Sequence, residues 1–326
     1  METLMPRALL SALLLFSSLL SHSALAQWQQ HQWDVMGTRA SVTLWSEQDA
    51  APLFAALEKE MSRLNMLLSP WVEDSELAKV NRLAASEPQT ISAEFYALLE
   101  KSRDYYQLTG GAFDISFASA GHLYDYREGT SPDEEALQKA TRHIDGSNIQ
   151  LLPANQVRFT DPGTTIDLGG IAKGYAIDQG IDLLKRAGIE QAWLSLGGDS
   201  YVLGDHRGRP WGVGIRHPRD KDAIAMRLPL SDIAMSTSGD YQRYFISKGE
   251  RIHHIISPET GKSAGELVSV TILTEKSIDA DALSTSVFVL GREKGLALIN
   301  RLANTSVIII DQQGEVYYSD DLVPPE

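Results

Sequence analysis

The chain has 326 residues, with 43 acidic residues against 29 lysines and arginines, and its net charge is −14. A nucleic-acid binder needs clustered basic residues, and no run of them occurs here, so nucleic-acid binding is excluded. The chain has no cysteine, which excludes disulfides, iron–sulfur clusters, thiolate zinc sites and a cysteine nucleophile. For the same reason we expect no lipid anchor on an N-terminal cysteine.

The first 26 residues have the pattern of a secretory signal. Arg7 precedes a short apolar stretch over 8–16, and small residues lead to Ala24-Leu25-Ala26, an A-x-A cleavage site. The apolar stretch is too short to span a membrane, and no other stretch approaches ~18 apolar residues. We therefore expect cleavage after Ala26 and a freely soluble periplasmic protein. The alternative is a buried N-terminal helix.

The first half of the mature chain is predicted to be mainly helical. Residues 39–44 alternate polar and apolar, as in a half-buried strand, and leucines over 53–68 recur at the spacing of an amphipathic helix. A second helix is expected to carry Phe95 to Tyr106 and to stop at Gly110-Gly111. A third is expected to start with Ser131 as N-cap, Pro132 at the first position and Glu134 closing a capping box.

After about residue 157 the sequence is predicted to be rich in strands. Because strands do not alternate regularly with helices, the predicted fold class is α+β, with mixed or antiparallel sheets and flanking helices. No repeat or linker divides the sequence, so residues 27–326 are predicted to form one domain of two lobes. The expected strands are 157–160, 192–196, 211–216, 252–256, 268–273 and 307–310, and the expected helices are 171–187, 281–290 and 293–302.

Residues 166–178 are the first candidate site. A strand-like approach to Gly169-Gly170 is followed by a helix whose first turn would present free N–H groups to an anion, with Lys173 adding a point charge. The stretch is neither a Walker loop nor a dinucleotide fingerprint. A purely structural turn explains these residues equally well.

A second candidate site opens the helix near residue 281. Asp281, Ser284 and Thr285 lie at i, i+3 and i+4, so their oxygens share one helical face and suit Mg²⁺. On these residues alone, helix capping with Asp279 or Asp281 as N-cap is the favoured alternative. His253 and His254 would point to opposite faces of a strand, so they cannot form a paired metal site.

These segments, taken together and in this order, resemble one family, the FAD:protein FMN transferases or ApbE proteins. The resemblance covers nearly the whole chain after the signal, and its most specific parts are the Asp-Leu-Gly-Gly-Ile-Ala-Lys-Gly-Tyr-Ala and Ala-Asp-Ala-Leu-Ser-Thr runs. The matching segments are 36–38, 68–71 with 74–77 and Asn81, 111–114, 167–178, 197–199, 238–241, 254–256 with Pro258 and 260–261, and 281–285.

The resemblance implies Mg²⁺-dependent cleavage of FAD, with FMN passed to a threonine or serine hydroxyl of an acceptor protein and AMP released. It also implies acceptors with exported FMN-binding domains, as in Na⁺-translocating NADH:quinone reductase or Rnf-type complexes. Two alternatives stay open: an FAD pyrophosphatase that uses water, and a non-catalytic periplasmic flavin-binding protein.

The resemblance also implies roles for individual residues. Asp281, Ser284, Thr285 and the carbonyl of Gly170 would bind the metal. His254 is our hypothesis for the general base, because its ordinary pKa of ~6.5 suits proton transfer near neutrality, and Asp167 is the second candidate. The residues implied for FAD binding are Met36, Trp71, Ala112, Phe113, Asp114, Asp167, Lys173, His254 and Ile255.

Three positions depart from the family pattern. Trp71 stands where tyrosine is frequent, which keeps ring stacking and loses a hydroxyl. Ser257 replaces the usual aspartate of the His-Ile-Ile-Asp-Pro run, so a carboxylate role there is in doubt. Ser284 stands where some members have aspartate, which makes the implied metal site less negative.

Overall fold

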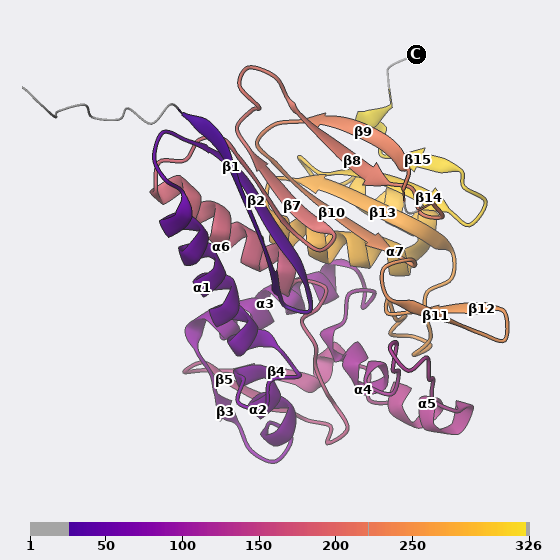
Figure 1. The fold of residues 1–326 in the computed structure, drawn as a ribbon. Helices are drawn as coiled ribbons and strands as arrows, with labels where there is room; N and C mark the ends of the chain where they lie inside the picture. The colour runs from indigo at the N-terminus through magenta and orange to yellow at the C-terminus, as the bar shows by residue number, and fades with distance from the viewer. Residues whose placement is uncertain (1–25, 221, 324–326) are drawn as a thin grey trace, which may run out of the picture.

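The structure is a computed structural model that describes residues 26–220 and 222–323 (Figure 1). The secretory signal predicted for residues 1–26 therefore lies outside the described residues, except for Ala26. The strands are β1 (Gln27–Val35), β2 (Thr38–Ser46), β3 (Gln89–Thr90), β4 (Ile149–Leu152), β5 (Gln156–Phe159), β6 (Ala192–Leu196), β7 (Asp199–Leu203), β8 (Trp211–Arg216), β9 (Ile224–Leu230), β10 (Ile233–Gly239), β11 (Tyr244–Ser247), β12 (Glu250–His253), β13 (Leu267–Thr274), β14 (Ser306–Asp311) and β15 (Val316–Tyr318). The helices are α1 (Ala51–Leu68), α2 (Glu76–Leu83), α3 (Ala93–Leu108), α4 (Ala118–Gly121), α5 (Glu134–Thr141), α6 (Ala172–Arg186) and α7 (Ser277–Ile299), with short 3₁₀ helices η1 (Ile115–Phe117), η2 (Gly146–Asn148) and η3 (Asp320–Leu322).

An eight-stranded sheet with the order β1-β2-β6-β7-β10-β13-β14-β15 forms the centre of the fold. All its neighbouring strands run antiparallel. Three small antiparallel sheets, β11-β12, β3-β5-β4 and β8-β9, lie outside it. The predicted α+β class is confirmed, and the sheets are of the antiparallel kind.

Helices cover one face of the large sheet and a hairpin covers the other (Figure 1). The predicted stripe of α1 is buried, with Leu57, Met61 and Leu64 in the main core beside residues of α6, β2 and β6. On the opposite face, Trp211 and Val213 of β8 pack in a second apolar cluster with residues of β7, β10 and β13. Residues of α6 and α7 also belong to the main core, so both helices pack against the large sheet.

A smaller lobe formed by α2 to α5 and the β3-β5-β4 sheet lies below the large sheet in Figure 1. Asn81 of α2 joins it to the 166–170 loop, because its side chain donates to the Ile166 carbonyl and accepts from the Ile166 amide, both at 2.9 Å. The amide of Asp167 donates to the carbonyl of Ile115 at 2.9 Å. None of the helices described is both long and apolar enough to cross a membrane.

Two predicted helix boundaries are wrong and one break is confirmed. Helix α5 begins at Glu134 with Asp133 as its N-cap, so Ser131 is not the cap; the Asp133 carboxylate accepts from the Ala136 amide at 2.8 Å. Helix α7 begins at Ser277, one turn earlier than expected. The expected break after residue 290 is present, because Gly291 has a φ of 79° inside α7.

Helices α6 and α7 cross at Gly174, where no side chain fits. A Cβ added to Gly174 would lie 2.2 Å from the Ser277 carbonyl oxygen and 2.8 Å from the Asp281 Cβ. Both helix starts would have to move apart to admit a methyl group, because the nearest atom belongs to the backbone.

A Gly174→Ala substitution is therefore expected to lower the free energy of unfolding by about 1–3 kcal/mol, the usual cost of overpacking a core. Denaturant unfolding followed by circular dichroism measures this change. Gly212→Ala is the matched control, since a Cβ at that exposed position meets no atom within 4 Å. Equal stability of the two variants would show that the helix crossing tolerates a side chain.

Candidate active site

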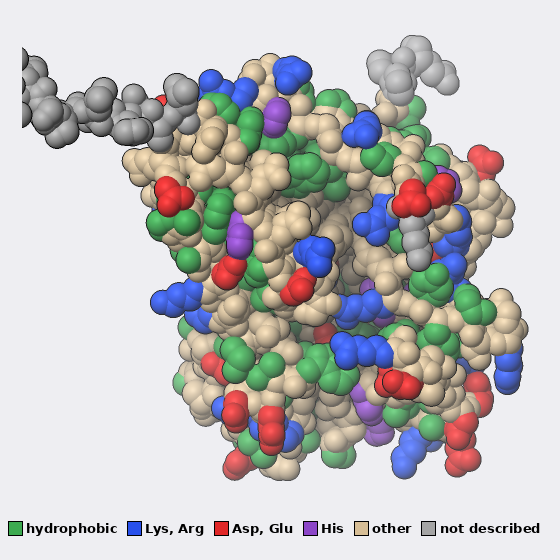
Figure 2. All heavy atoms as spheres, viewed as in Figure 1, with side chains coloured by type: hydrophobic (Ala, Val, Ile, Leu, Met, Phe, Trp, Pro, Cys, Tyr) green, Lys and Arg blue, Asp and Glu red, His purple; other side chains and the backbone are tan. Residues whose placement is uncertain are grey.

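The predicted site residues gather where the large sheet and the smaller lobe meet. They come from the starts of α6 and α7, the 166–170 loop, the β1–β2 turn and the base of the β11–β12 hairpin. Figure 2 shows a hollow near the centre of the face it presents, with lysine and arginine side chains beside it.

The starts of α6 and α7 cap each other through carboxylates. Asp281 of α7 accepts a hydrogen bond from the Gly174 amide of α6 at 3.0 Å. In return, Asp178 of α6 accepts from the amides of Ser277 and Ile278 at 2.8 and 3.0 Å. The capping alternative for Asp281 on its own helix is therefore wrong: its carboxylate serves α6, and neither helix has a side-chain cap of its own.

Lys173 forms ion pairs with two buried carboxylates. Its ammonium contacts Asp199 and lies 3.1 Å from Oδ1 of Asp281. Burial opposes the charged form of Lys173, but the two carboxylates together raise its pKa above the ordinary value. Burial, and then repulsion from Asp199, raise the pKa of Asp281. The lysine charge is thus already shared between two acidic partners.

A row of hydroxyl groups lies beside this ion-pair cluster. Ser284 is buried, donates to the Asp281 carbonyl at 3.0 Å, and its oxygen lies 3.0 and 2.9 Å from the hydroxyls of Ser236 and Ser238. Ser236 also donates to Asp199. The hydroxyl of Thr285 has a longer contact, with the Ser238 hydroxyl oxygen 3.5 Å away.

The carboxylate and hydroxyl oxygens at the start of α7 suit a hard cation that takes part of its ligands from water or substrate. The part of the chain that the structure describes contains no group of three His, Asp or Glu side chains placed to hold a metal. Gly170 approaches Thr285 so closely that a Cβ on it would lie 3.2 Å from the threonine hydroxyl oxygen. One carboxylate with neutral oxygens fits Mg²⁺, which takes its remaining ligands from water and substrate phosphates.

His254 is held as a neutral imidazole with a free nitrogen. Burial, and then the positive charge of Arg243, lower its pKa to about 3. Its Nδ1 is buried and has no hydrogen-bond partner among the described residues. The neighbouring His253 differs, because its Nε2 contacts the Ala264 carbonyl at 2.8 Å and its Nδ1 accepts from the Ile255 amide at 3.3 Å.

This depressed pKa predicts a pH dependence of stability. The folded-state pKa of His254 is about 3 and the unfolded value is 6.5, so between these pH values the unfolded chain binds the extra proton. The stabilising contribution is complete above pH 6.5 and is lost as the pH falls toward 3. A His254→Gln variant, which cannot take up this proton, should lose less Tm than the parent between pH 6.5 and 4. Equal losses would contradict a lowered pKa for His254 in the folded protein.

Asp167 lies in the loop that Asn81 holds. Its Oδ1 accepts a hydrogen bond from the Gly169 amide at 2.6 Å. Burial raises its pKa, which the Gly169 bond and the charge of Arg243 oppose. The two candidate bases, Asp167 and His254, are therefore both within the field of Arg243.

Two residues implied in ring contacts lie in turns. Met36 has a φ of 51° in the β1–β2 turn and packs against the main core. Trp71 is 83% exposed after α1, with its amide 3.2 Å from the Ser69 hydroxyl. No described side chain stacks on Trp71, so its indole is accessible to a planar partner.

Other implied FAD contacts are engaged inside the protein. Asp114 is buried, and its carboxylate accepts from the Ser116 amide and hydroxyl and from the Gly146 amide at 2.6–2.8 Å. Phe113 is also buried and packs at Gly170, while Ala112 beside it is half-buried. The Ile255 carbonyl accepts from the Ala264 amide at 3.0 Å. Asp114 thus holds the 113–117 turn in place, and its Oδ2 accepts the single bond from the Gly146 amide.

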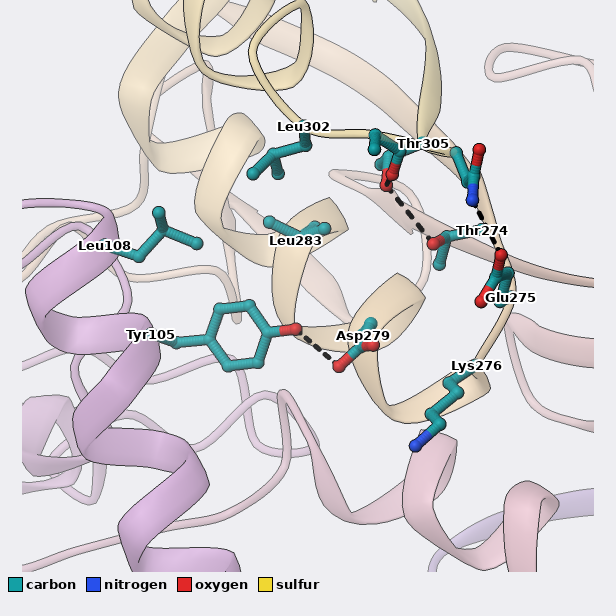
Figure 3. A pocket seen from close by; sticks show the side chains of 11 residues that line it. Tyr105, Leu108, Thr274, Glu275, Lys276, Asp279, Leu283, Leu302 and Thr305 are labelled. Atoms are coloured by element: carbon teal, nitrogen blue, oxygen red, sulfur yellow. Dashed lines mark hydrogen bonds between the residues drawn. The ribbon is translucent and has the colours of Figure 1, made fainter.

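A separate cavity of about 240 Å³ lies on the other side of the start of α7 (Figure 3). Asp279 and Leu283 face this cavity, and Tyr105 donates to Asp279 at 2.6 Å. Asp279 and Asp281 are two residues apart on a helix, so their side chains point to nearly opposite faces. None of the predicted site residues lines this cavity.

Comparison with known proteins shows the family of this chain. Residues 36–309 match the ApbE family. The chain belongs to the ApbE family. Its relatives include proteins named FAD:protein FMN transferase from Treponema pallidum, 34% identical over 89% of this chain and 86% of that protein, and from Vibrio cholerae, 30% identical over 85% of each.

Solved ApbE structures share the fold. The ApbE protein of Thermotoga maritima superposes with a TM-score of 0.84 at 30% identity, covering 90% of this chain and 98% of that one. The flavin transferase ApbE of Vibrio cholerae gives a TM-score of 0.81 at 27% identity with the same coverage.

Sequence reasoning assigned no role to Asp199, Ser236 or Arg243, which the ApbE fold of this chain brings to the site. The sequence could have indicated Asp199, since this residue ends a Gly-Gly-Asp segment that matches the family. Ser236 carried no signal, because a serine in a strand is ordinary and its partner is 37 residues away.

Proposed function

We propose that this protein is a Mg²⁺-dependent transferase that moves FMN from FAD to a threonine or serine hydroxyl of an acceptor protein and releases AMP. Membership of the ApbE family and the names of the relatives support FMN transfer. The observation in this chain that carries the proposal is the buried Asp281 carboxylate, placed beside Lys173 and one helical turn before Thr285.

Asp281, Thr285 and the carbonyl of Gly170 would hold the metal. Bound Mg²⁺ would neutralise charge on the FAD diphosphate and make its phosphorus easier to attack. Ser284 was expected to be a further ligand, but its hydroxyl is occupied by Ser236, Ser238 and the Asp281 carbonyl. We assign Ser284 to fixing Asp281 and Thr285 in position.

His254 would accept the proton of the acceptor hydroxyl. The hydroxyl oxygen forms a bond to the FMN phosphorus, the bond to AMP breaks, and AMP leaves with the electron pair. The proton passes to the imidazole of His254, which is neutral because burial lowers its pKa to about 3. The negative diphosphate would raise that pKa toward neutrality when FAD binds, which makes the imidazole a better base.

The flavin and adenine rings of FAD would contact Met36 and Trp71. The exposed indole offers a stacking face, and the methionine thioether in the β1–β2 turn is polarizable. Asp167, Ala112 and Phe113 would line the path between them. The acceptors we propose are exported FMN-binding domains of redox complexes, and export of this chain stays a prediction from residues 1–26.

Incubation of the mature protein with FAD, Mg²⁺ and a purified FMN-binding domain tests the proposal. In-gel flavin fluorescence on the acceptor, lost when its acceptor threonine is replaced by alanine, is the expected result. Release of free FMN and AMP alone would indicate a hydrolase. FAD binding without turnover would indicate a flavin-binding protein.

A further inference from the structure

Arg243 links the strand that leads to His254 with the turn that carries Met36. Its carbonyl oxygen accepts from the His254 amide at 3.2 Å, at the base of the β11–β12 hairpin. Its Nη2 donates to the carbonyl of Gly37 in the β1–β2 turn at 3.3 Å. Arg243 therefore connects two separate segments of the site, through its backbone carbonyl to His254 and through its guanidinium to the β1–β2 turn.

Arg243 differs from Lys173 and Arg219 because it forms no ion pair with a carboxylate of the described residues. Within residues 26–220 and 222–323 no carboxylate lies at ion-pair distance from it, and its side chain is exposed. Lys173 shares its charge with Asp199 and Asp281, and Arg219 contacts both oxygens of Asp240 at 2.6 and 2.8 Å. In a chain of net charge −14, Arg243 is thus a guanidinium at the β1–β2 turn with no acidic partner among the described residues.

The charge of Arg243 reaches both candidate bases. It contributes to the lowered pKa of His254 and opposes the rise in the pKa of Asp167. A group that influences both residues lies close to the place where the proposed phosphoryl transfer occurs. Its present partner, a neutral carbonyl, is weaker than a phosphate, which a guanidinium binds through paired charge-assisted hydrogen bonds.

We propose that Arg243 binds the diphosphate group of FAD, exchanging the Gly37 carbonyl for phosphate oxygens. This inference rests on the proposed function and adds a substrate-binding residue to it. It also gives the two cations different roles. Lys173 neutralises the carboxylates of Asp199 and Asp281, and Arg243 binds the negatively charged diphosphate.

Calorimetric titration of the Mg²⁺-loaded protein with FAD tests the inference. Arg243→Gln should raise the Kd about 10- to 100-fold, the loss expected for a hydrogen-bonded charge, and should flatten the dependence of Kd on NaCl. Arg243→Lys should lie between the two, because it keeps the charge and loses the forked geometry. Lys248→Gln, at the exposed far turn of the same hairpin, makes the same charge change and should bind like the parent.

An unchanged Kd in Arg243→Gln would overturn the inference. A raised Kd with the salt dependence of the parent would also overturn it, because the effect would then come from shape and not from charge. If the parent transfers FMN and Arg243→Gln binds FAD normally, only this inference fails. If the parent does not bind FAD, the proposed function fails with it.

Discussion

An Asp281→Asn variant is expected to lose FMN transfer by about 10³-fold. Stabilisation of transition-state charge by a metal ion is worth several kcal/mol, and each 1.36 kcal/mol is tenfold in rate. Asparagine keeps an oxygen for the Gly174 amide but removes the anionic ligand. Lys173 then pairs with Asp199 alone, so the variant should remain folded. The measurement is the initial rate of acceptor fluorescence as a function of Mg²⁺ concentration.

Asp279→Asn is the matched control for this prediction. It removes the same charge from the same helix, on the face that points to the separate cavity and contacts Tyr105 and Lys101. Its transfer rate should stay close to that of the parent. Retention of normal transfer by Asp281→Asn, or an equal loss in both variants, would show that the metal does not depend on Asp281.

A His254→Gln variant is expected to transfer FMN about 10²–10⁴ times more slowly, the usual contribution of a general base. FAD affinity should change little, because the proposed diphosphate contact belongs to Arg243 and the metal. The readout is single-turnover transfer at saturating FAD, with FAD binding measured separately. His253→Gln serves as the comparison, since His253 is engaged with Ala264 and Ile255 and should affect stability more than rate.

Normal transfer by His254→Gln at saturating FAD would remove His254 as the base. Asp167 would then be the remaining candidate, and Asp167→Asn should show the loss instead. A variant that loses FAD affinity in proportion to its rate would indicate a binding role for the replaced residue.

Much of the fold was predictable because its signals are local. The apolar spacing of α1 and the strand-like runs at 192–196, 211–216, 268–273 and 307–310 depend on neighbouring residues, and the structure confirms them. The expected strand 252–256 is wrong at its end, because β12 stops at His253. Gly291 broke the last long helix as expected. The start of α5 was wrong by two residues, because Ser131 and Asp133 are both good N-caps and only the bond to Ala136 decides between them.

The electrostatics of the site could not be predicted from local pattern. Lys173 is separated from Asp199 by 26 residues and from Asp281 by 108, so nothing near the lysine indicates that its charge is matched. The position of Lys173 after two glycines suggested that it binds an anionic ligand. In the structure it forms ion pairs with two carboxylates of the protein itself. The family resemblance pointed to Asp114 for FAD, and the sequence did not indicate that its carboxylate also accepts from the amides of Ser116 and Gly146.

The mutual capping of α6 and α7 makes the site a property of the whole chain. Each helix start depends on a carboxylate about 100 residues away, so neither half of the site forms without the other. A fragment that ends before α7 would expose unsatisfied amides at Gly174 and would have no Asp281. Split halves of the chain should therefore regain FAD binding only on reassociation, and a newly made chain would become able to bind flavin only after α7 has docked.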